Sequence, residues 1–336
     1  MRAHIQYETV FDTVERHCMS SPSSVIQATV TLRVHRFTPR PERERRHSSS
    51  PFGRRGGSPF ADSARAGRPR GKSWVQEYEL LVRPEDTLLD CLLTIKRDID
   101  PTLAFRYSCG HGMCGSDAVA VNGTPTLLCT AQVQDWVQRL PNISYPDDEG
   151  FRRTGDVDDA DNANVFEEDL AHQIDEGDHL GVIELAALPG FPVKRDLVAD
   201  IDSMLEQIRR LKPYLIHHNA IKTREDGKVD VLEYLQNPQE LAKYELLSNC
   251  IACGVCEGAC PVYAGGEAFI GPAALINQAR FINDSRDTAT EERLEALDTA
   301  DGVQACQSVR ACSRQCPRGI DVGEEIWQLI AQVKER

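Results

Sequence analysis

The stretch RYSCGHGMCGSDAVAVNGTPTLLC, residues 106–129, contains two overlapping patterns that predict different folds. Cysteines stand at positions 109, 114 and 129, spaced as metal ligands often are. The glycines between them spell G-x-G-x-x-G, the pattern of a loop that holds a dinucleotide phosphate: Gly110, Gly112 and Gly115. The residues around these glycines decide between the two interpretations.

The dinucleotide interpretation fails on its surroundings. A phosphate-binding loop of this kind follows a strand directly, opens a helix and has an acidic residue about 20 positions further on. Here the glycines are interleaved with cysteines, and AVAVNGTP (118–125) predicts a strand and a turn. We therefore interpret the glycines as the residues that let the backbone curl around a metal centre, because glycine adopts positive φ without strain.

The spacing Cys109-x4-Cys114-x2-Asp117-x11-Cys129 predicts a 2Fe-2S site. Plant-type ferredoxins hold this cluster with C-x4-C-x2-C and a distant cysteine. Asp117 stands in the third ligand position, and a carboxylate can bind iron although it is a harder ligand than thiolate. The alternative is that Asp117 is a solvated loop residue and the cluster is absent or held differently.

Seven further cysteines form two complementary runs. CIACGVCEGACP (250–261) reads C-x2-C-x2-C-x3-C-P, as in two-cluster bacterial ferredoxins, where the fourth cysteine ligates the other cluster. CQSVRACSRQCP (306–317) is the second run. Together they predict a 4Fe-4S cluster held by four thiolates: Cys250, Cys253, Cys256 and Cys316. The other cluster is left with Cys260, Cys306 and Cys312.

The residue that would complete the second run is Val309, three residues after Cys306 and three before Cys312. Valine cannot ligate iron, so three thiolates favour a 3Fe-4S cluster at this site. Zinc is the structural alternative, but a zinc site closes with four ligands in one tetrahedron. Three cysteines crowded in C-x2-C-x2-C suit the separate corners of a cubane better.

The chain offers no residue set for acid–base or nucleophilic catalysis. His217 and His218 are adjacent, but they belong to no catalytic motif in the sequence. Three clusters in series without a reaction site predict a protein that relays single electrons from a two-electron donor to a distant acceptor.

These cysteine motifs, with FPVKRDLVAD and FIGPAALINQARFINDSRD, resemble the iron–sulfur subunit of succinate dehydrogenase and fumarate reductase. The resemblance implies an α+β chain, with a β-grasp 2Fe-2S ferredoxin domain at 28–195 and an all-α helical ferredoxin domain at 196–336. Residues 1–27 would be an N-terminal extension. Some family members carry aspartate at the third 2Fe-2S position, so the resemblance favours Asp117 as a ligand.

The resemblance also implies partners. These are a flavoprotein that interconverts succinate and fumarate on covalent FAD, and membrane-anchor subunits that complete a quinone site near the 3Fe-4S cluster. Pro261, Gln307 and Val309 would lie close to that quinone. Many family members have histidine where Gln307 stands, and a tryptophan within the stretch that here reads VYAGGEA. These departures concern the quinone contacts and leave the cluster ligands unaffected.

Charge is distributed unevenly along the 336 residues. The net charge is −14, yet residues 1–73 hold 14 Lys+Arg against 6 Asp+Glu, so the remainder carries −22. Only 8 of the 38 basic residues are lysine. The negative charges of this remainder repel one another at low salt, and this repulsion is screened at high salt. We hypothesise a halophilic archaeon with a salty cytoplasm; a GC-rich genome that favours arginine is the alternative.

Two segments have compositions that cannot bury a core. Residues 41–72 are rich in Arg, Ser, Gly and Pro, and residues 147–178 hold 13 Asp+Glu against two Arg. We interpret both as flexible insertions in the first domain. An arginine tract can bind nucleic acid, but the acidic body predicts no nucleic-acid partner.

Strands are predicted at 28–37 and 74–82 from their alternation, and one helix at 87–100. Cys91 lies in this helix among leucines, which indicates a small core residue, whereas Cys18 has no partner nearby. PAALINQARFI and GEEIWQLIAQV predict two more helices. One face of a further amphipathic helix is marked by Leu197, Val198, Ile201, Met204, Leu205, Ile208 and Leu211.

No apolar run is long enough to span a membrane, and no secretory signal is evident, although either Met1 or Met19 could be the start. We therefore expect the chain at the cytoplasmic face of the cell membrane, held by partner subunits. The leading interpretation of the function is an electron-transfer subunit of succinate:quinone oxidoreductase. The alternatives are a fumarate reductase that runs in the opposite direction, a soluble thiol-linked flavoprotein reductase, and a zinc-stapled nucleic-acid-binding scaffold.

Overall fold

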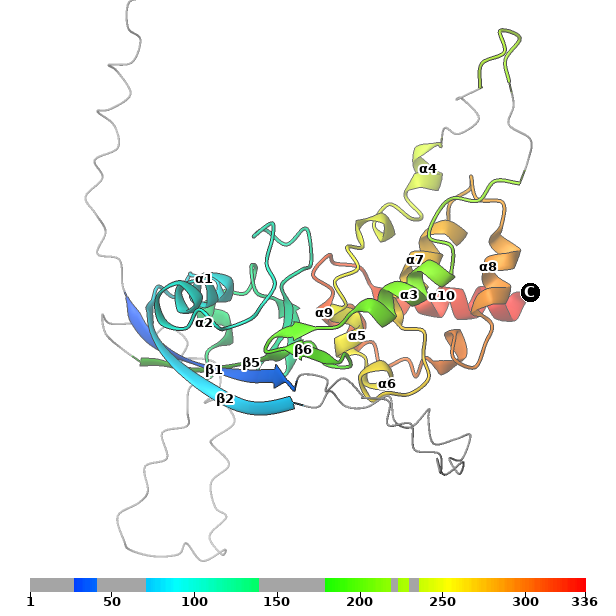
Figure 1. The fold of residues 1–336 in the computed structure, drawn as a ribbon. Helices are drawn as coiled ribbons and strands as arrows, with labels where there is room; N and C mark the ends of the chain where they lie inside the picture. The colour runs from blue at the N-terminus through cyan, green and yellow to red at the C-terminus, as the bar shows by residue number, and fades with distance from the viewer. Residues whose placement is uncertain (1–26, 41–70, 139–178, 219–222, 230–235) are drawn as a thin grey trace, which may run out of the picture.

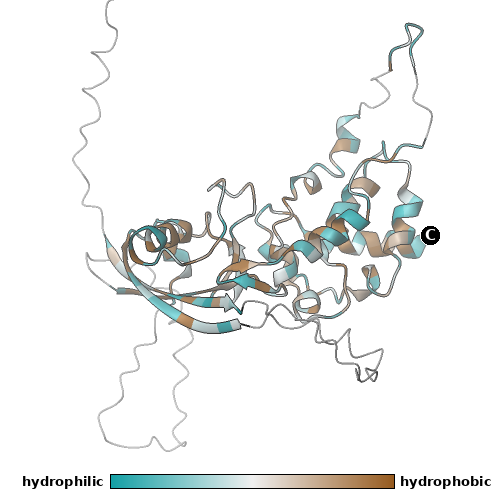
Figure 2. Ribbon diagram, in the orientation of Figure 1, coloured by the Kyte–Doolittle hydropathy of each residue, from teal (hydrophilic) through white to brown (hydrophobic). Residues whose placement is uncertain are grey.

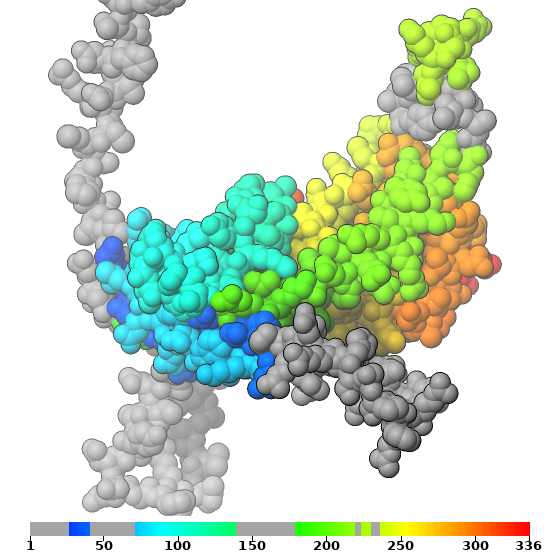
Figure 3. All heavy atoms as spheres, viewed as in Figure 1, coloured from blue at the N-terminus to red at the C-terminus, as the bar shows by residue number. Residues whose placement is uncertain are grey.

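The fold comes from a computed structural model, and the structure describes residues 27–40, 71–138, 179–218, 223–229 and 236–336. A sheet with short helices forms one part of the molecule and a group of helices forms the other (Figure 1). The segment from β6 to α3 runs over the surface from the first part to the second (Figure 3). The chain is therefore organised as two domains in contact.

The first domain is built on a five-stranded sheet of order β2-β1-β5-β3-β4. Its strands are β1 (Ala28–Pro39), β2 (Gly71–Val82), β3 (Ala118–Val121), β4 (Thr124–Leu127) and β5 (His179–Ala187). The β1–β5 pair is parallel, and the other pairs are antiparallel. The predicted alternation is confirmed in β1, where Val30, Leu32 and Val34 are wholly buried and Arg33 is exposed. One face of β1 therefore lies on the core.

The predicted helix 87–100 forms as α1 (Leu88–Thr94), which continues as a π-helical stretch from Ile95 to Ile99. Thr87 caps the helix, because its side chain accepts a hydrogen bond from the Asp90 amide and Asp90 bonds back to the Thr87 amide. Cys91 is 2% exposed in the first core, which confirms its assignment as a core residue, and burial raises its pKa to about 12. The helix α2 (Val133–Trp136) follows β4.

The predicted helix face at 197–211 is wrong at its start. Leu197 and Val198 belong to a small hairpin, β6 (Val193–Arg195) and β7 (Val198–Ala199), and α3 runs only from Asp202 to Arg210. The reason is Asp196, whose φ is 46° and whose carboxylate accepts hydrogen bonds from the Phe37 and Ala104 amides. This buried carboxylate fixes a turn where a helix would otherwise continue.

From α3 onward, the regular elements in the described part of the chain are helices, apart from an isolated bridge between Thr223 and Val229. The helices predicted from PAALINQARFI and GEEIWQLIAQV are confirmed as α7 (Pro272–Ile282) and α10 (Val322–Glu335). Nine of the eleven residues of α7 are buried, whereas α3 and α8 (Thr290–Leu297) are largely hydrophilic (Figure 2). The short helices are α4 (Pro238–Leu241), α5 (Val255–Ala259), α6 (Pro261–Ala264) and α9 (Ala311–Gln315), with 3-10 turns at Leu247–Asn249 and Val303–Ala305.

Helix α5 joins the two domains. Val255 is wholly buried in the core of the first domain, and Ile251 and Cys253 pack against the same core. A Cβ built on Gly258 would lie 3.0 Å from Leu188 and 3.2 Å from Pro125. The first domain therefore packs directly on a helix that lies within the cysteine run at 250–261.

Several expectations fall outside the described residues: the N-terminal extension with Cys18, and the insertion at 147–178. The insertion expected at 41–72 is shorter than predicted, since β2 already begins at Gly71 and pairs with Pro39. In the part of the chain that the structure describes, no helix is long and apolar enough to cross a membrane.

Candidate iron–sulfur centres

The loop from Cys109 to Asp117 turns its backbone amides toward cysteine sulfurs. The Met113 amide donates to Cys109 Sγ at 3.4 Å, and the Gly112 amide donates to Cys129 Sγ at 3.3 Å. Positive φ at three positions makes this possible: Gly110 (73°), Gly112 (75°) and Gly115 (67°). The positive φ predicted for these glycines is confirmed.

Asp117 is not a solvated loop residue, since it is only 3% exposed. Its Oδ2 accepts a hydrogen bond of 2.7 Å from the Cys129 amide. Its Oδ1 is buried and has no hydrogen-bond partner among the described residues. A buried acceptor left unpaired costs about 1–3 kcal/mol. A bond to iron would remove that cost, so the carboxylate fits the third ligand position that its spacing predicts.

The thiols of this loop differ in acidity. Amide donors, that of His111 first, lower the pKa of Cys109 to about 7, so its thiolate forms readily. Burial and the neighbouring Asp117 raise the pKa of Cys129 to about 12. A bound cation must therefore compensate the Cys129 thiolate, which couples cluster binding to proton release.

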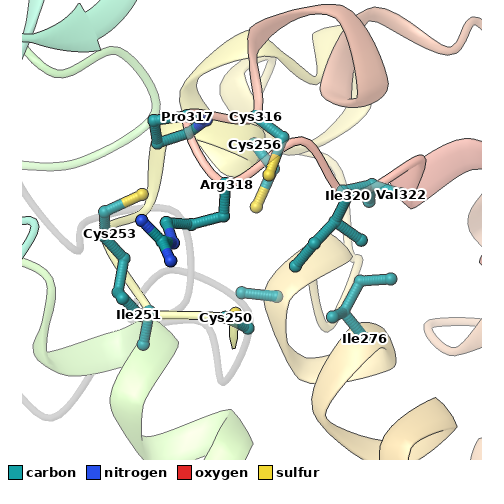
Figure 4. A pocket seen from close by; sticks show the side chains of 12 residues that line it. Cys250, Ile251, Cys253, Cys256, Ile276, Cys316, Pro317, Arg318, Ile320 and Val322 are labelled. Atoms are coloured by element: carbon teal, nitrogen blue, oxygen red, sulfur yellow. The ribbon is translucent and has the colours of Figure 1, made fainter. Parts of the chain in front are cut away.

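Four cysteines far apart in sequence line one cavity in the second domain: Cys250, Cys253, Cys256 and Cys316. Their side chains lie around the cavity with Arg318 among them (Figure 4). Most of the other lining residues are apolar: Ile251, Ala252, Ala273, Ile276, Pro317, Ile320 and Val322. These are the four residues that the spacing predicts for a 4Fe-4S cluster.

Local backbone geometry places these thiols. Ala252 and Gly254 have φ of 50° and 80°, so the chain curls between Cys250 and the first turn of α5. Burial raises the pKa of Cys253 to about 12 and that of Cys256 well above its usual value. Thiolates at these positions again need a positive centre between them.

A second cavity is lined by the three remaining cysteines, Cys260, Cys306 and Cys312. Burial raises the pKa of Cys312 to about 11. Cys260 ends α5 and begins α6, so the two cavities are only one short helix apart. The three residues expected near a quinone line this same cavity: Pro261, Gln307 and Val309.

The backbone around Val309 repeats the backbone around Cys253. In the first run, Ala252 and Gly254 on either side of Cys253 have positive φ, and Ser308 (57°) and Arg310 (60°) take these places beside Val309. Left-handed backbone is uncommon outside glycine. Val309 therefore occupies the position of a ligand, with an apolar side chain that is 49% exposed.

The thiol groups surround cavities instead of meeting at a point. Among the described residues, no three His, Cys, Asp or Glu side chains are gathered tightly enough to hold a single metal ion. A zinc site needs four ligands at about 2.0–2.3 Å from one ion. The arrangement around the cavities fits a multi-iron cluster, whose corners accept separate thiolates.

Two charged residues in these centres carry no motif signal and were not predicted. Glu257 is wholly buried; its Oε1 accepts 2.7 Å from the Ala273 amide and its Oε2 lies 3.0 Å from Cys256 Sγ. Burial raises the pKa of Glu257. Arg318 follows Cys316-Pro317 and lines the 4Fe-4S cavity. Each also contacts residues distant in sequence, Glu257 the Ala273 amide and Arg318 the Met113 sulfur, although the place of Arg318 directly after the Cys-Pro was visible in the sequence.

Comparison with known families agrees with this geometry. Residues 31–206 match the 2Fe-2S iron-sulfur cluster binding domain, and residues 246–320 match the 4Fe-4S dicluster domain. The protein is therefore an iron–sulfur protein with a ferredoxin-type domain followed by a dicluster domain.

Curated relatives narrow the class. The chain is 35% identical over 246 residues to the fumarate reductase iron-sulfur subunit of Mycobacterium tuberculosis, covering 73% of this chain and 80% of the relative. It is 31% identical over 268 residues to that of Escherichia coli O6:H1, covering 77% and 89%. The chain belongs to the family of iron–sulfur subunits of fumarate reductase and succinate dehydrogenase, so the resemblance inferred from its motifs is confirmed.

A solved structure shares the fold. A chain of the Mycobacterium smegmatis Sdh1 complex in the apo form superposes with a TM-score of 0.60 at 21% identity, covering 92% of this chain and 97% of that chain. The agreement extends over both domains.

Proposed function

We propose that the chain is the electron-transfer subunit of a succinate:quinone oxidoreductase, and that it relays electrons between a succinate/fumarate flavoprotein and membrane quinone. The observation that carries this proposal is the series of three thiol-lined centres. The Gly115 loop touches Cys253, and one short helix, α5, separates the second and third centres. When bound, the clusters take up and release single electrons.

We assign the ligands as the spacing predicts. Cys109, Cys114, Asp117 and Cys129 hold 2Fe-2S in a domain of β-grasp type. The second, helical domain holds 4Fe-4S at Cys250, Cys253, Cys256 and Cys316, and 3Fe-4S at Cys260, Cys306 and Cys312. The unpaired buried Oδ1 of Asp117 and the two thiol-lined cavities support this assignment.

The chain's own residues hold and insulate the centres. Amide donors in the 109–117 loop stabilise negative charge on sulfur. Apolar side chains around the 4Fe-4S cavity limit water access, which is one of the factors that set a cluster's potential. Pro261, Gln307 and Val309 line the second cavity, and we propose that quinone approaches the chain at this end.

The partners follow from the family. The relatives are named as iron–sulfur subunits of fumarate reductase. From the family resemblance we propose that this chain works with a flavoprotein that carries FAD and with membrane-anchor subunits. We place the chain at the cytoplasmic face of the cell membrane, bound through these subunits. A fumarate reductase would use the same ligands with electrons in the opposite direction.

Two measurements test the proposal. Anaerobically prepared protein should contain acid-labile sulfide and about nine irons per chain, with EPR signals of three different clusters. Membranes that carry the complex should reduce quinone with succinate, and the Cys253→Ser variant should lose this activity. Activity confined to the soluble fraction would reject the membrane partner, and a colourless zinc protein would reject the electron relay.

A further inference from the structure

Arg318 connects the first two centres. It lines the 4Fe-4S cavity, and its guanidinium Nη1 lies 3.1 Å from the Met113 sulfur, on the loop of the 2Fe-2S centre. Its Nε donates to the carbonyl of Asn249, the residue before Cys250, at 3.3 Å. Figure 4 shows the side chain extended among the cysteines of the cavity. A single side chain thus touches both cysteine loops.

The backbone fixes this placement. The Gly319 amide donates to the Cys316 carbonyl at 3.1 Å, which closes a turn with Pro317 and Arg318 in its centre. Gly319 has a φ of 69°, and Ile320 beyond it is buried. Arg318 is therefore presented by a short, anchored turn directly attached to a ligand cysteine.

The charge of Arg318 can affect the reduction potential of a cluster in this cavity. Among the described residues that line this cavity, Arg318 is the only charged side chain other than the thiols. Four thiolates leave a bound cluster negative, and reduction adds a further negative charge. A cation at an apolar cavity wall stabilises the reduced form more than the oxidised form, which raises the potential.

We propose that Arg318 is a positioning residue that raises the reduction potential of the 4Fe-4S centre and holds the 2Fe-2S loop against it. The inference rests on the proposed function, because it requires that this cavity seats the cluster. The charge acts on the potential, and the Met113 contact acts on the distance between the two loops. These two effects are separable by substitution.

The test uses the complete complex loaded with clusters. The variants are Arg318→Gln, Arg318→Lys and Met113→Leu, with Arg97→Gln as the matched control, since Arg97 is exposed and pairs only with Asp98 among the described residues. EPR-monitored redox titration gives the midpoint potential of the 4Fe-4S cluster. The magnetic coupling between the reduced 2Fe-2S and 4Fe-4S clusters reports their separation.

We expect Arg318→Gln to shift the 4Fe-4S potential to more negative values and to weaken the coupling. Arg318→Lys should restore most of the potential, Met113→Leu should weaken only the coupling, and Arg97→Gln should change neither. Loss of the 4Fe-4S cluster in Arg318→Gln but not in Arg318→Lys would also support a requirement for charge.

An unchanged potential in loaded Arg318→Gln, an equal shift in Met113→Leu, or cluster loss in both Arg318 variants would overturn the inference. The failure of the proposed function gives a different result. Wild-type protein without sulfide, or with clusters but without succinate-dependent quinone reduction, rejects that function before any Arg318 variant is compared.

Discussion

Gly115 lies where the two cysteine loops come closest, and Gly115→Ala should push them apart. A Cβ at this position would lie 2.5 Å from Cys253 Cβ and 3.0 Å from Cys253 Cα. Carbon atoms without a bond between them rest about 3.5–4.0 Å apart, so the loops must separate by about 1 Å. Overpacking of this kind costs about 1–3 kcal/mol. The left-handed φ of 67° adds about 1–2 kcal/mol for a residue with a side chain.

Gly110→Ala is the matched control in the same loop. Gly110 has a φ of 73°, but nothing lies within 4 Å of its added Cβ. The Gly110→Ala variant should therefore lose only the backbone contribution of about 1–2 kcal/mol from its free energy of unfolding. Gly115→Ala should lose about 2–5 kcal/mol in total. Urea unfolding followed by the loss of cluster absorbance measures the difference between the two variants.

The displacement also has a spectroscopic signature. Gly115→Ala should weaken the magnetic coupling between the 2Fe-2S and 4Fe-4S clusters, and Gly110→Ala should preserve it. Equal destabilisation by both variants, together with unchanged coupling in Gly115→Ala, would show that this glycine is not required for a close approach of the two loops.

Val309→Cys should supply the missing fourth thiolate, because the backbone here repeats that around Cys253; iron should rise from about nine to about ten per chain as the 3Fe-4S EPR signal is lost, and a persistent 3Fe signal would contradict this. Asp117→Cys should retain 2Fe-2S with a shifted potential, and an unshifted titration would indicate that the carboxylate was never bound. Arg293→Met should lower the free energy of unfolding by about 3–5 kcal/mol, because it removes the ion-pair partner of the buried Asp287; urea unfolding that matches the wild type would refute this. Finally, the acidic body should make the midpoint of urea unfolding rise with salt, whereas equal stability at low salt would contradict a halophilic origin.

The elements that the sequence predicted well are those with strong local signals. Alternation is sufficient to predict β1, since its buried face lies on a single core. Helix α7 matches its predicted segment because apolar residues run through it from Pro272 to Ile282. The grouping of cysteines around the two cavities was visible because cluster chemistry imposes fixed spacings between cysteines. These signals do not depend on distant parts of the chain.

Features that depend on distant contacts were missed. The helix predicted to include Leu197 begins only at Asp202, because Asp196 is held in a left-handed turn by amides of residues 37 and 104. No local pattern reveals a carboxylate that is buried by partners far away in sequence. Arg318 and Glu257 escaped prediction for the same reason, since each matters only once the cysteine loops have come together.

The placement of Val255 bears on how the protein is made. This side chain fills the core of the first domain, yet it comes well after that domain's last strand in the sequence, within the cysteine run at 250–261. During synthesis the amino-terminal half therefore emerges from the ribosome with a gap in its interior, which closes only when α5 arrives. We expect the amino-terminal half expressed by itself to be poorly packed, so that metal insertion into the first centre would await translation of the second.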